Sequence, residues 1–308
     1  MTYINHYDTG RGAARGSATH RVAEADPPVH GPACRLFAIP DIRERRPAGA
    51  IVPGGVRTSF VCPVATGGMR VLRGRAASVE ADRGRTQRII ERATEAGEPA
   101  LRVWTPHRHV AFGRRDANAE GYDRAREFAR ERGYPPVERQ VGGRAVAYTG
   151  STVAFSYTQP GADRTAIDRR YADAVERVRG TLADLGVDAS EGEPEGAFCP
   201  GTHSLQARGK VAGLAQRVRR DVAVVGGIVV VRDRGAIADV LEPVYDALGI
   251  PFERDAVGSV ASAGGPEDPA TVCDVLVDAF ADGDIQETYT DCCKSLPDRP
   301  HDSVRSDR

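Results

Sequence analysis

The stretch Gly209-Lys210-Val211-Ala212-Gly213-Leu214-Ala215-Gln216-Arg217 lies within a β-rich run that covers residues 205–231 and ends in Gly227-Ile-Val-Val-Val. Its glycines and alanines leave space around Lys210, and the flanking residues indicate a strand edge that faces a cavity. A lysine in such a place can polarise a carbonyl group or stabilise a developing negative charge. It can also favour the thiolate form of a nearby cysteine. The stretch therefore predicts a strand that carries a reactive group.

Lys210 is also unusual in composition, because only two of the 42 basic residues are lysine and the other one is Lys294. Arginine has replaced lysine nearly everywhere that a positive charge alone suffices. An ammonium group is a compact point charge on a flexible stem, whereas a guanidinium group is a planar fork of fixed geometry. We therefore expect Lys210 to do something that arginine cannot do. On composition alone, the alternative that one of two lysines fell there by chance stays open.

Short strands and amphipathic helices alternate around this stretch, from Met69 onward. Strand patterns cover residues 69–73, 101–104, 110–113 and, in two runs, 137–157. The second and third of these look like a strand pair that Pro106 interrupts. Helical spacing predicts helices over residues 81–96, 119–132, 163–185, 237–248 and 269–280. Helices mixed with several hairpin-like strands favour an α+β fold over a regular βαβ array.

The chain divides into three parts by composition. Residues 1–68 are rich in Gly, Pro, Ala and Arg and sustain no helical or strand period, so they cannot bury enough apolar surface to offset their chain entropy. They are predicted to be disordered, or to be an extension that a translation start placed too far upstream would explain. A globular domain is expected over residues 69–283, followed by a polar, frayed tail over residues 284–308.

Charge and hydropathy exclude two classes of protein. The chain has 42 basic and 43 acidic residues, so it lacks the strong positive charge that nucleic-acid binders use. No run of eighteen apolar residues predicts a membrane span, and the N-terminus lacks the apolar core of a secretory signal. We expect a cytoplasmic protein with no nucleic-acid or membrane partner. Its six cysteines show no regular spacing and are expected to be reduced.

A second motif is Arg139-Gln-Val-Gly142-Gly143-Arg144-Ala145-Val146, which precedes Ala147-Tyr148-Thr149. Paired glycines between strands let the backbone approach a ligand closely, and their N–H groups can form an anion-binding nest. Arg139 and Arg144 can add positive charge against a phosphate or a carboxylate. An ordinary β-turn is the alternative reading of the two glycines.

A third motif, Phe198-Cys199-Pro200-Gly201-Thr202-His203-Ser204, brings a cysteine to a Pro-Gly loop eleven residues before Lys210. A cysteine in such a loop is a weaker candidate for core packing than one on a helix, such as Cys273. A thiolate beside an ammonium group is the activated form that a nucleophile needs. An inert loop cysteine is the alternative, since reactivity depends on local charge and exposure.

These three segments, in this order, resemble the lipoate-protein ligase and octanoyltransferase superfamily, which shares its fold with biotin-protein ligases. The Arg-x-x-Gly-Gly-x-Ala-Val stretch at 139–146 is similar to the family's acyl-binding loop. The stretch at 210–217 is similar to its Lys-x-x-Gly-x-Ala-Gln-Arg signature. The similarity extends more loosely over residues 69–280. It implies a mixed, mainly antiparallel sheet flanked by helices, and a catalytic domain over residues 69–283.

The resemblance also implies the site. Lys210 is implied to lie against the acyl carbonyl, and Gly142, Gly143 and Ala145 to line the acyl or acyl-adenylate pocket. The residues that the two motifs place at the substrate are Arg139, Gly142, Gly143, Arg144, Ala145, Val146, Gly213, Ala215 and Gln216.

The Phe198-Cys199-Pro-Gly loop resembles one branch in particular, the amidotransferases that move octanoyl from the glycine cleavage H protein to other lipoyl domains. This implies that Cys199 forms an acyl-thioester and that Lys210 activates it. The expected function is attachment of lipoyl or octanoyl groups to the lysine of lipoyl carrier domains, namely the glycine cleavage H protein and the E2 subunits of 2-oxoacid dehydrogenases. Such transfer requires no cofactor.

Two alternatives stay open. An ATP-dependent lipoate-protein ligase would use ATP and Mg²⁺ and act through lipoyl-AMP, with Cys199 incidental. Against it, Arg144 stands where adenylate-forming members have a third glycine, and Tyr148-Thr149 replaces their His-Asp pair.

The other alternative is a zinc-binding module without catalytic activity, with ligands from His107, His109, Cys199 and His203. We expect no metal, because His-x-His beside Pro106 is more often a solvated strand end.

Overall fold

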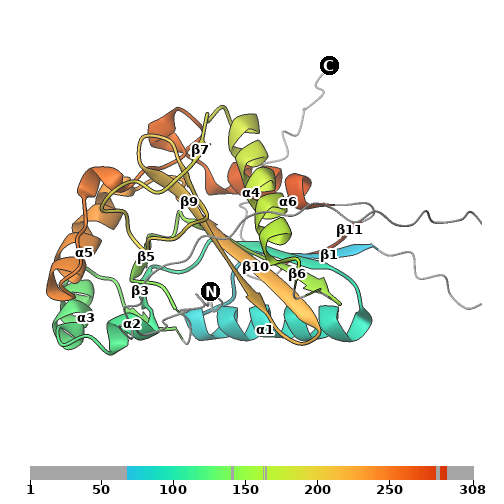
Figure 1. Ribbon diagram of the computed structural model, residues 1–308, viewed down its shortest axis with the longest axis horizontal. Helices are drawn as coiled ribbons and strands as arrows, with labels where there is room; N and C mark the ends of the chain where they lie inside the picture. Colours follow the sequence, from blue (N-terminus) through green and yellow to red (C-terminus); the bar gives the residue numbers. More distant parts are fainter. Residues whose placement is uncertain (1–67, 140–141, 162, 164, 282–284, 290–308) are drawn as a thin grey trace, which may run out of the picture. The chain divides into compact units, whose positions relative to one another are not determined.

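A mainly antiparallel sheet carries most of the strands of the computed structural model, which describes residues 68–139, 142–161, 163, 165–281 and 285–289 (Figure 1). In spatial order its strands are β11 (Ile285–Tyr289), β1 (Met69–Arg73), β2 (Ala100–Trp104), β6 (Val153–Pro160), β10 (Val222–Val229), β9 (Lys210–Val218), β8 (Ser204–Gln206) and β7 (Ser190–Glu191). β1 is parallel to β11 and to β2, and every later pair is antiparallel. The expected α+β fold with a mainly antiparallel sheet is confirmed.

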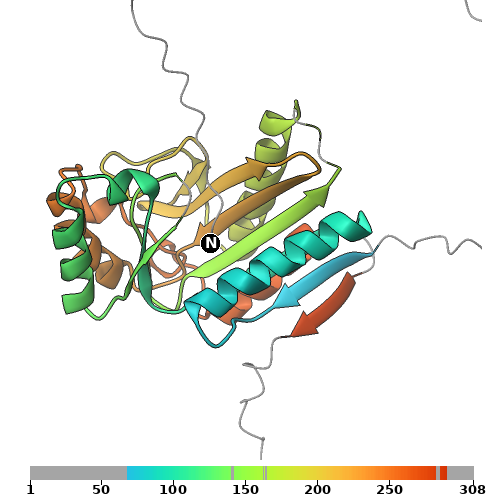
Figure 2. The ribbon, with the colours of Figure 1, turned by 90° about the horizontal axis from the view of Figure 1, so that it is seen from below.

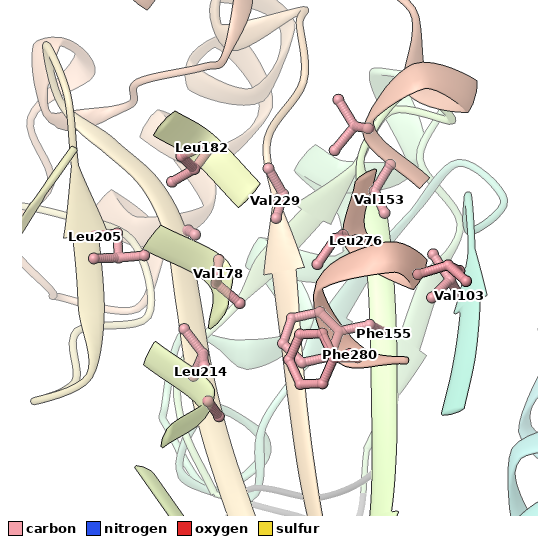
Figure 3. Packing of buried hydrophobic residues seen from close by; sticks show 14 of the residues in the cluster. Val103, Val153, Phe155, Val178, Leu182, Leu205, Leu214, Val229, Leu276 and Phe280 are labelled. Carbon is pink, nitrogen blue, oxygen red and sulfur yellow. The ribbon is translucent and has the colours of Figure 1, made fainter. Parts of the chain in front are cut away.

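Helices cover both faces of this sheet (Figure 2). The helices are α1 (Val79–Ala96), α2 (Arg114–Ala117), α3 (Tyr122–Glu131), α4 (Ile167–Asp184), α5 (Arg234–Ala247) and α6 (Pro269–Phe280), with short 3-10 turns η1 (Arg254–Ala256) and η2 (Ala261–Ala263). On one face Ile90 of α1 packs with Val224 of β10. On the other face α4 and α6 pack on Val229, with Val178 and Phe280 in the same cluster (Figure 3). Successive residues of β10 alternate between these two cores.

A second sheet of three strands, β4 (Pro136–Glu138), β3 (His109–Phe112) and β5 (Val146–Tyr148), lies beside α3 and α5. Its core includes Phe112 and Tyr148 from the small sheet and Tyr245 from α5. The same core includes Ile228 of β10 and Val230, which directly follows β10. The small sheet is thereby anchored against the large one, and Ala145, directly before β5, belongs to the same core.

Several expectations from the sequence are wrong in detail. Residues 101–104 and 110–113 do not pair with each other, because β2 joins the large sheet and β3 joins the small one. Pro106 lies in the segment that passes between the sheets, where its missing N–H breaks no ladder. The helix expected over 119–132 is preceded by the separate helix α2.

The C-terminal boundary also differs from the expectation. Five residues that were assigned to the polar tail form β11, which pairs in parallel with β1. Arg73 of β1 binds the carboxylate of Glu287 at 2.9 Å and so links the two strands. The predictions for residues 1–67 and 290–308 lie outside the described residues. None of the described helices is both long and apolar enough to cross a membrane.

His109 is a buried titratable group in the small sheet, with 6% of its surface exposed. Its ring stacks on Tyr148 at 4.5 Å, and its Nδ1 atom makes a hydrogen bond of 2.7 Å with the backbone oxygen of His107. Burial lowers the pKa of His109 to about 4. The native state therefore holds a neutral imidazole at pH values where the unfolded chain already binds a proton.

This pKa shift predicts a loss of stability in acid. A folded pKa below the unfolded one contributes stability that is complete above the unfolded value near 6.5 and is lost as pH falls toward 4. Between pH 7.5 and pH 5 the contribution amounts to about 2 kcal/mol. Urea unfolding of the protein and of His109→Phe at both pH values will measure it. The variant is expected to lose about 2 kcal/mol less than the native protein, and equal losses would contradict the assignment.

Candidate active site

A cavity of about 550 Å³ opens on the face of the large sheet that also carries α1. Its floor follows from strand register, since Ala215 of β9 is opposite Gly226 of β10, and Gly226 is opposite Ser156 of β6. Three small residues in one row across three strands leave a gap that larger side chains would fill. Val224 and Ile228, two positions to either side of Gly226, border the gap with apolar surface. Cavities of this size and character bind small, mostly apolar ligands.

Lys210 lies at the start of β9 and is 2% exposed. Its Nζ atom donates to both carboxylate oxygens of Glu193, at 2.9 and 3.1 Å. It also donates to the backbone oxygens of Phe198 at 3.1 Å and Cys199 at 2.9 Å. The ammonium charge is thus paired and surrounded by acceptors, as a buried charge must be. Lys210 holds the cysteine loop through the backbone.

The glycines beside Lys210 have different roles. A Cβ atom at Gly213 would lie 3.1 Å from Cε of Lys210, so this glycine does give the lysine room, as expected. A Cβ atom at Gly209 would instead lie 2.6 Å from the backbone nitrogen of Gly258. Gly209, with φ of 107°, therefore permits a close approach of two backbone segments.

Glu193 is a residue of the site that the sequence analysis missed. Its Oε2 atom accepts hydrogen bonds from the Gly201 N–H at 3.1 Å and from the Ser204 hydroxyl at 2.5 Å. Together with the Lys210 ion pair, these bonds join the loop after Cys199 to β8 and β9. The available signal was indirect, because a buried lysine needs an acid and Glu193 lies in the Gly-Pro segment just before the cysteine loop.

Cys199 adopts a left-handed backbone conformation with φ of 42°, which costs a non-glycine residue about 1–2 kcal/mol. Two side chains hold it there. Its N–H donates to the Tyr245 hydroxyl at 2.6 Å, and its carbonyl accepts from Lys210. The Tyr245 hydroxyl in turn donates to the Ala145 carbonyl at 2.9 Å. Burial raises the pKa of Tyr245 well above its usual value, so this hydroxyl remains a donor.

The thiol of Cys199 meets the glycine-rich loop. Nη2 of Arg139 lies 3.5 Å from Sγ of Cys199 and also donates to the carbonyl of Arg144 at 2.5 Å. A Cβ atom at Gly143 would lie 2.9 Å from Sγ and 2.8 Å from Nη2. Gly143, with φ of 86°, is therefore the position where only glycine lets the loop, the guanidinium group and the thiol come together.

The structure brings most of the expected site residues to the cavity wall. The lining contains Arg139, Gly143, Val146, Cys199, Lys210, Gly213, Ala215 and Gln216. Gly142, Arg144 and Ala145 lie outside it, and Arg144 instead pairs with Asp116 at 3.4 Å.

The side chain of Gln216 is occupied by α4. Its oxygen accepts from Arg170 at 3.0 Å, and its nitrogen donates to the Ile167 carbonyl at 2.7 Å. Gln216 therefore fixes the start of α4 at the wall of the cavity, and its expected contact with substrate stays a prediction.

The candidate zinc ligands do not converge. Nε2 of His107 bonds the Ala76 carbonyl at 2.8 Å, His109 stacks on Tyr148, and the ring of His203 stacks on Tyr171 at 3.6 Å. Among the described residues, no group of three or more His, Cys, Asp or Glu side chains is placed to hold a metal ion.

Comparison with known proteins defines the class. The sequence model of the lipoyl protein ligase A/B catalytic domain matches residues 85–281, and the chain belongs to this family. A solved lipoate-protein ligase A bound with ATP superposes with a TM-score of 0.59 and 20% identity over 72% of this chain and 89% of that one. This likeness confirms the fold.

Among curated proteins, the chain is similar to octanoyl-GcvH:protein N-octanoyltransferases. That of an Exiguobacterium species is 30% identical over 156 residues, which cover 50% of this chain and 56% of the relative. That of Geobacillus kaustophilus is 34% identical over 130 residues, or 41% and 46% of the two chains. The chain therefore spans about half the length of these relatives.

Replacement of Lys210 by arginine is expected to abolish the function of the site although the charge is kept. Four acceptor atoms converge on one nitrogen at 2.9–3.1 Å, and Gly213 lies against the lysine stem. A planar guanidinium group cannot replace this point charge without displacing the Cys199 loop. The activity of the site should fall by about 100-fold or more, the scale of a loss of about 3 kcal/mol. Lys294→Arg is the matched control, and a Lys210→Arg variant as active as this control would contradict the role.

Proposed function

We propose that this chain transfers an octanoyl group, or the closely similar lipoyl group, to the lysine of lipoyl carrier domains through a thioester on Cys199. The observation that carries the proposal is the position of the Cys199 thiol. It lies on the wall of an apolar cavity, and Cys199 has a strained backbone conformation. Tyr245 binds the N–H of Cys199, and Lys210 binds its carbonyl oxygen. Strain that the surroundings maintain in this way is typical of functional positions. The activity for which the similar octanoyl-GcvH:protein N-octanoyltransferases are named supports the same reaction.

The reaction then has two steps. Sulfur of Cys199 attacks the carbonyl carbon of the acylated lysine on the donor carrier, a C–S bond forms, and the amide C–N bond breaks. The proton that the thiol loses is taken up by the departing lysine amine. The amine of the acceptor carrier next attacks the thioester, a C–N bond forms, the C–S bond breaks, and the sulfur takes up the proton that the amine loses, which regenerates the thiol. Donor and acceptor are proposed to be the glycine cleavage H protein and an E2 lipoyl domain.

The same residues give little support to an adenylate-forming ligase. Neither an aspartate nor a glutamate is among the described residues that line the cavity, so the lining offers Mg²⁺ no carboxylate ligand. Arg144, which stands in place of a third loop glycine, directs its guanidinium group to Asp116. Phosphates of ATP would therefore find neither the expected glycine nor a free arginine there.

Trapping the thioester tests the proposed reaction. Incubation with octanoylated glycine cleavage H protein, without ATP, should give an adduct on Cys199 that hydroxylamine removes and that peptide mass spectrometry locates. Cys199→Ser should lose the adduct and the transfer activity. Cys273→Ser, a change in the half-buried cysteine of α6, should keep both. Activity that requires ATP and survives in Cys199→Ser would assign the protein to the ligase reaction instead.

The size of the side chains on the cavity floor is expected to set which acyl chain lengths are accepted. A Cβ atom at Gly226 meets only the Phe155 carbonyl oxygen, at an ordinary 3.5 Å, so a side chain there fits on the strand and projects into the cavity. Gly226→Val should reduce transfer of octanoyl by about tenfold or more while retaining butanoyl, since two lost methylene contacts amount to about 1.4 kcal/mol or more. Gly180→Val on α4 is the control, because an added Cβ there meets nothing within 4 Å. An unchanged octanoyl-to-butanoyl preference in Gly226→Val would place the acyl chain elsewhere.

A further inference from the structure

We infer that Arg139, rather than Lys210, is the cation that stabilises the negative charge on the sulfur of Cys199 during the reaction, and that it is therefore a catalytic residue. The inference rests on the proposed function, in that it assigns a role within the same reaction. It follows from how the buried charges of the site are paired.

The charge of Lys210 is already balanced. Its ammonium group contacts both oxygens of Glu193, and its remaining acceptors are backbone oxygens of Phe198 and Cys199. An ion pair of this kind is close to neutral as a unit, so its field at a third atom is weak compared with that of an unpaired charge. The contacts of Lys210 with the nucleophile are with its backbone, which makes Lys210 a positioning residue.

Arg139 is in the opposite situation. It is 4% exposed, and among the described residues no carboxylate lies within ion-pair distance of its guanidinium group. Buried Asp116 pairs with Arg144 and accepts from the Gly113 N–H. A buried cation without a counter-ion costs several kcal/mol. Among the described residues, the nucleophilic atom that Nη2 of Arg139 contacts is Sγ of Cys199, at 3.5 Å.

The protonation of Arg139 agrees with this pairing. Burial by itself lowers the pKa of Arg139, but the nearby Cys199, Tyr148 and Asp116 raise it by more, so the net shift is upward. The carbonyl of Arg144 fixes the orientation of the guanidinium group at 2.5 Å. An arginine remains charged at every working pH, so it offers the thiol a permanent partner.

This pairing serves both halves of the reaction. In the first, it stabilises the negative charge that the sulfur gains as the thiol proton leaves for the departing amine. In the second, the thioester sulfur carries no charge, so Arg139 is left buried without a counter-ion until the thiolate departs. The guanidinium group therefore stabilises the leaving thiolate when the acceptor amine attacks. No additional reactant is needed in either step.

Alkylation of Cys199 by iodoacetamide, followed by peptide mass spectrometry between pH 5.5 and 9.5, tests the inference without donor or acceptor. In Arg139→Gln the rate at pH 7 should fall by about tenfold or more, and the pH of half-maximal rate should rise by about one unit or more. Arg139→Lys should recover part of this change because it keeps the charge. Lys210→Gln should lose transfer activity, and its half-maximal pH should move by less than that of Arg139→Gln, because the charge that it removes is balanced by Glu193.

The inference is overturned if the pH profile stays native in Arg139→Gln, or if it moves in Lys210→Gln instead. Should Arg139→Gln fail to fold, Arg139→Met takes its place, because it also removes the charge, and a native profile in that variant contradicts the inference in the same way. Failure of the proposed function is a separate result. A thiolate that depends on Arg139 in a protein that forms no octanoyl thioester would remove the reaction and leave the charge pairing intact.

Discussion

The hydrogen bonds of the Lys210 ammonium group are the interaction on which the candidate site depends. One buried nitrogen on β9 binds the carboxylate of Glu193 and the backbone oxygens of Phe198 and Cys199. A buried charge must find such partners or the fold loses several kcal/mol. Because two of these partners are backbone atoms of the cysteine loop, satisfying the charge also fixes the loop. The stability of the core and the position of the thiol are therefore one constraint.

Much of this site could be predicted from the sequence, but its support could not. Lys210, Cys199 and the glycine-rich loop carry local patterns, and all three meet at the cavity. Glu193 and Tyr245 carry none, since an acid in a Gly-Pro loop and a tyrosine on a helix are common. Their roles arise only when folding brings them to the cysteine loop, Tyr245 from 46 residues away along the chain. The same limit explains β2 and β3, whose separation into two sheets depends on partners distant in sequence.

Strand register explains why the cavity exists where it does. The strands β9, β10 and β6 would form a continuous apolar layer if each position carried a large side chain, as Val224 and Ile228 do. The row of Ala215, Gly226 and Ser156 interrupts that layer at one level. Every second residue of a strand points to the same face, so on β10 the next positions on this face, two residues away, again carry large side chains, those of Val224 and Ile228. On this strand the apolar layer is therefore interrupted only at this row. The cavity thus results from three small residues in one row, while the strands keep their regular pairing.

The scarcity of lysine in this chain takes on a geometric meaning beside the two buried cations. At Arg139 both acceptors, a carbonyl oxygen and a sulfur atom, lie at the single nitrogen Nη2. At Lys210 four oxygens surround a single nitrogen, which a compact ammonium group on a thin stem brings to all of them past Gly213. A planar guanidinium group has no nitrogen that is open to acceptors on all sides. A chain that uses arginine for all but two of its 42 basic residues retains lysine where four acceptors converge.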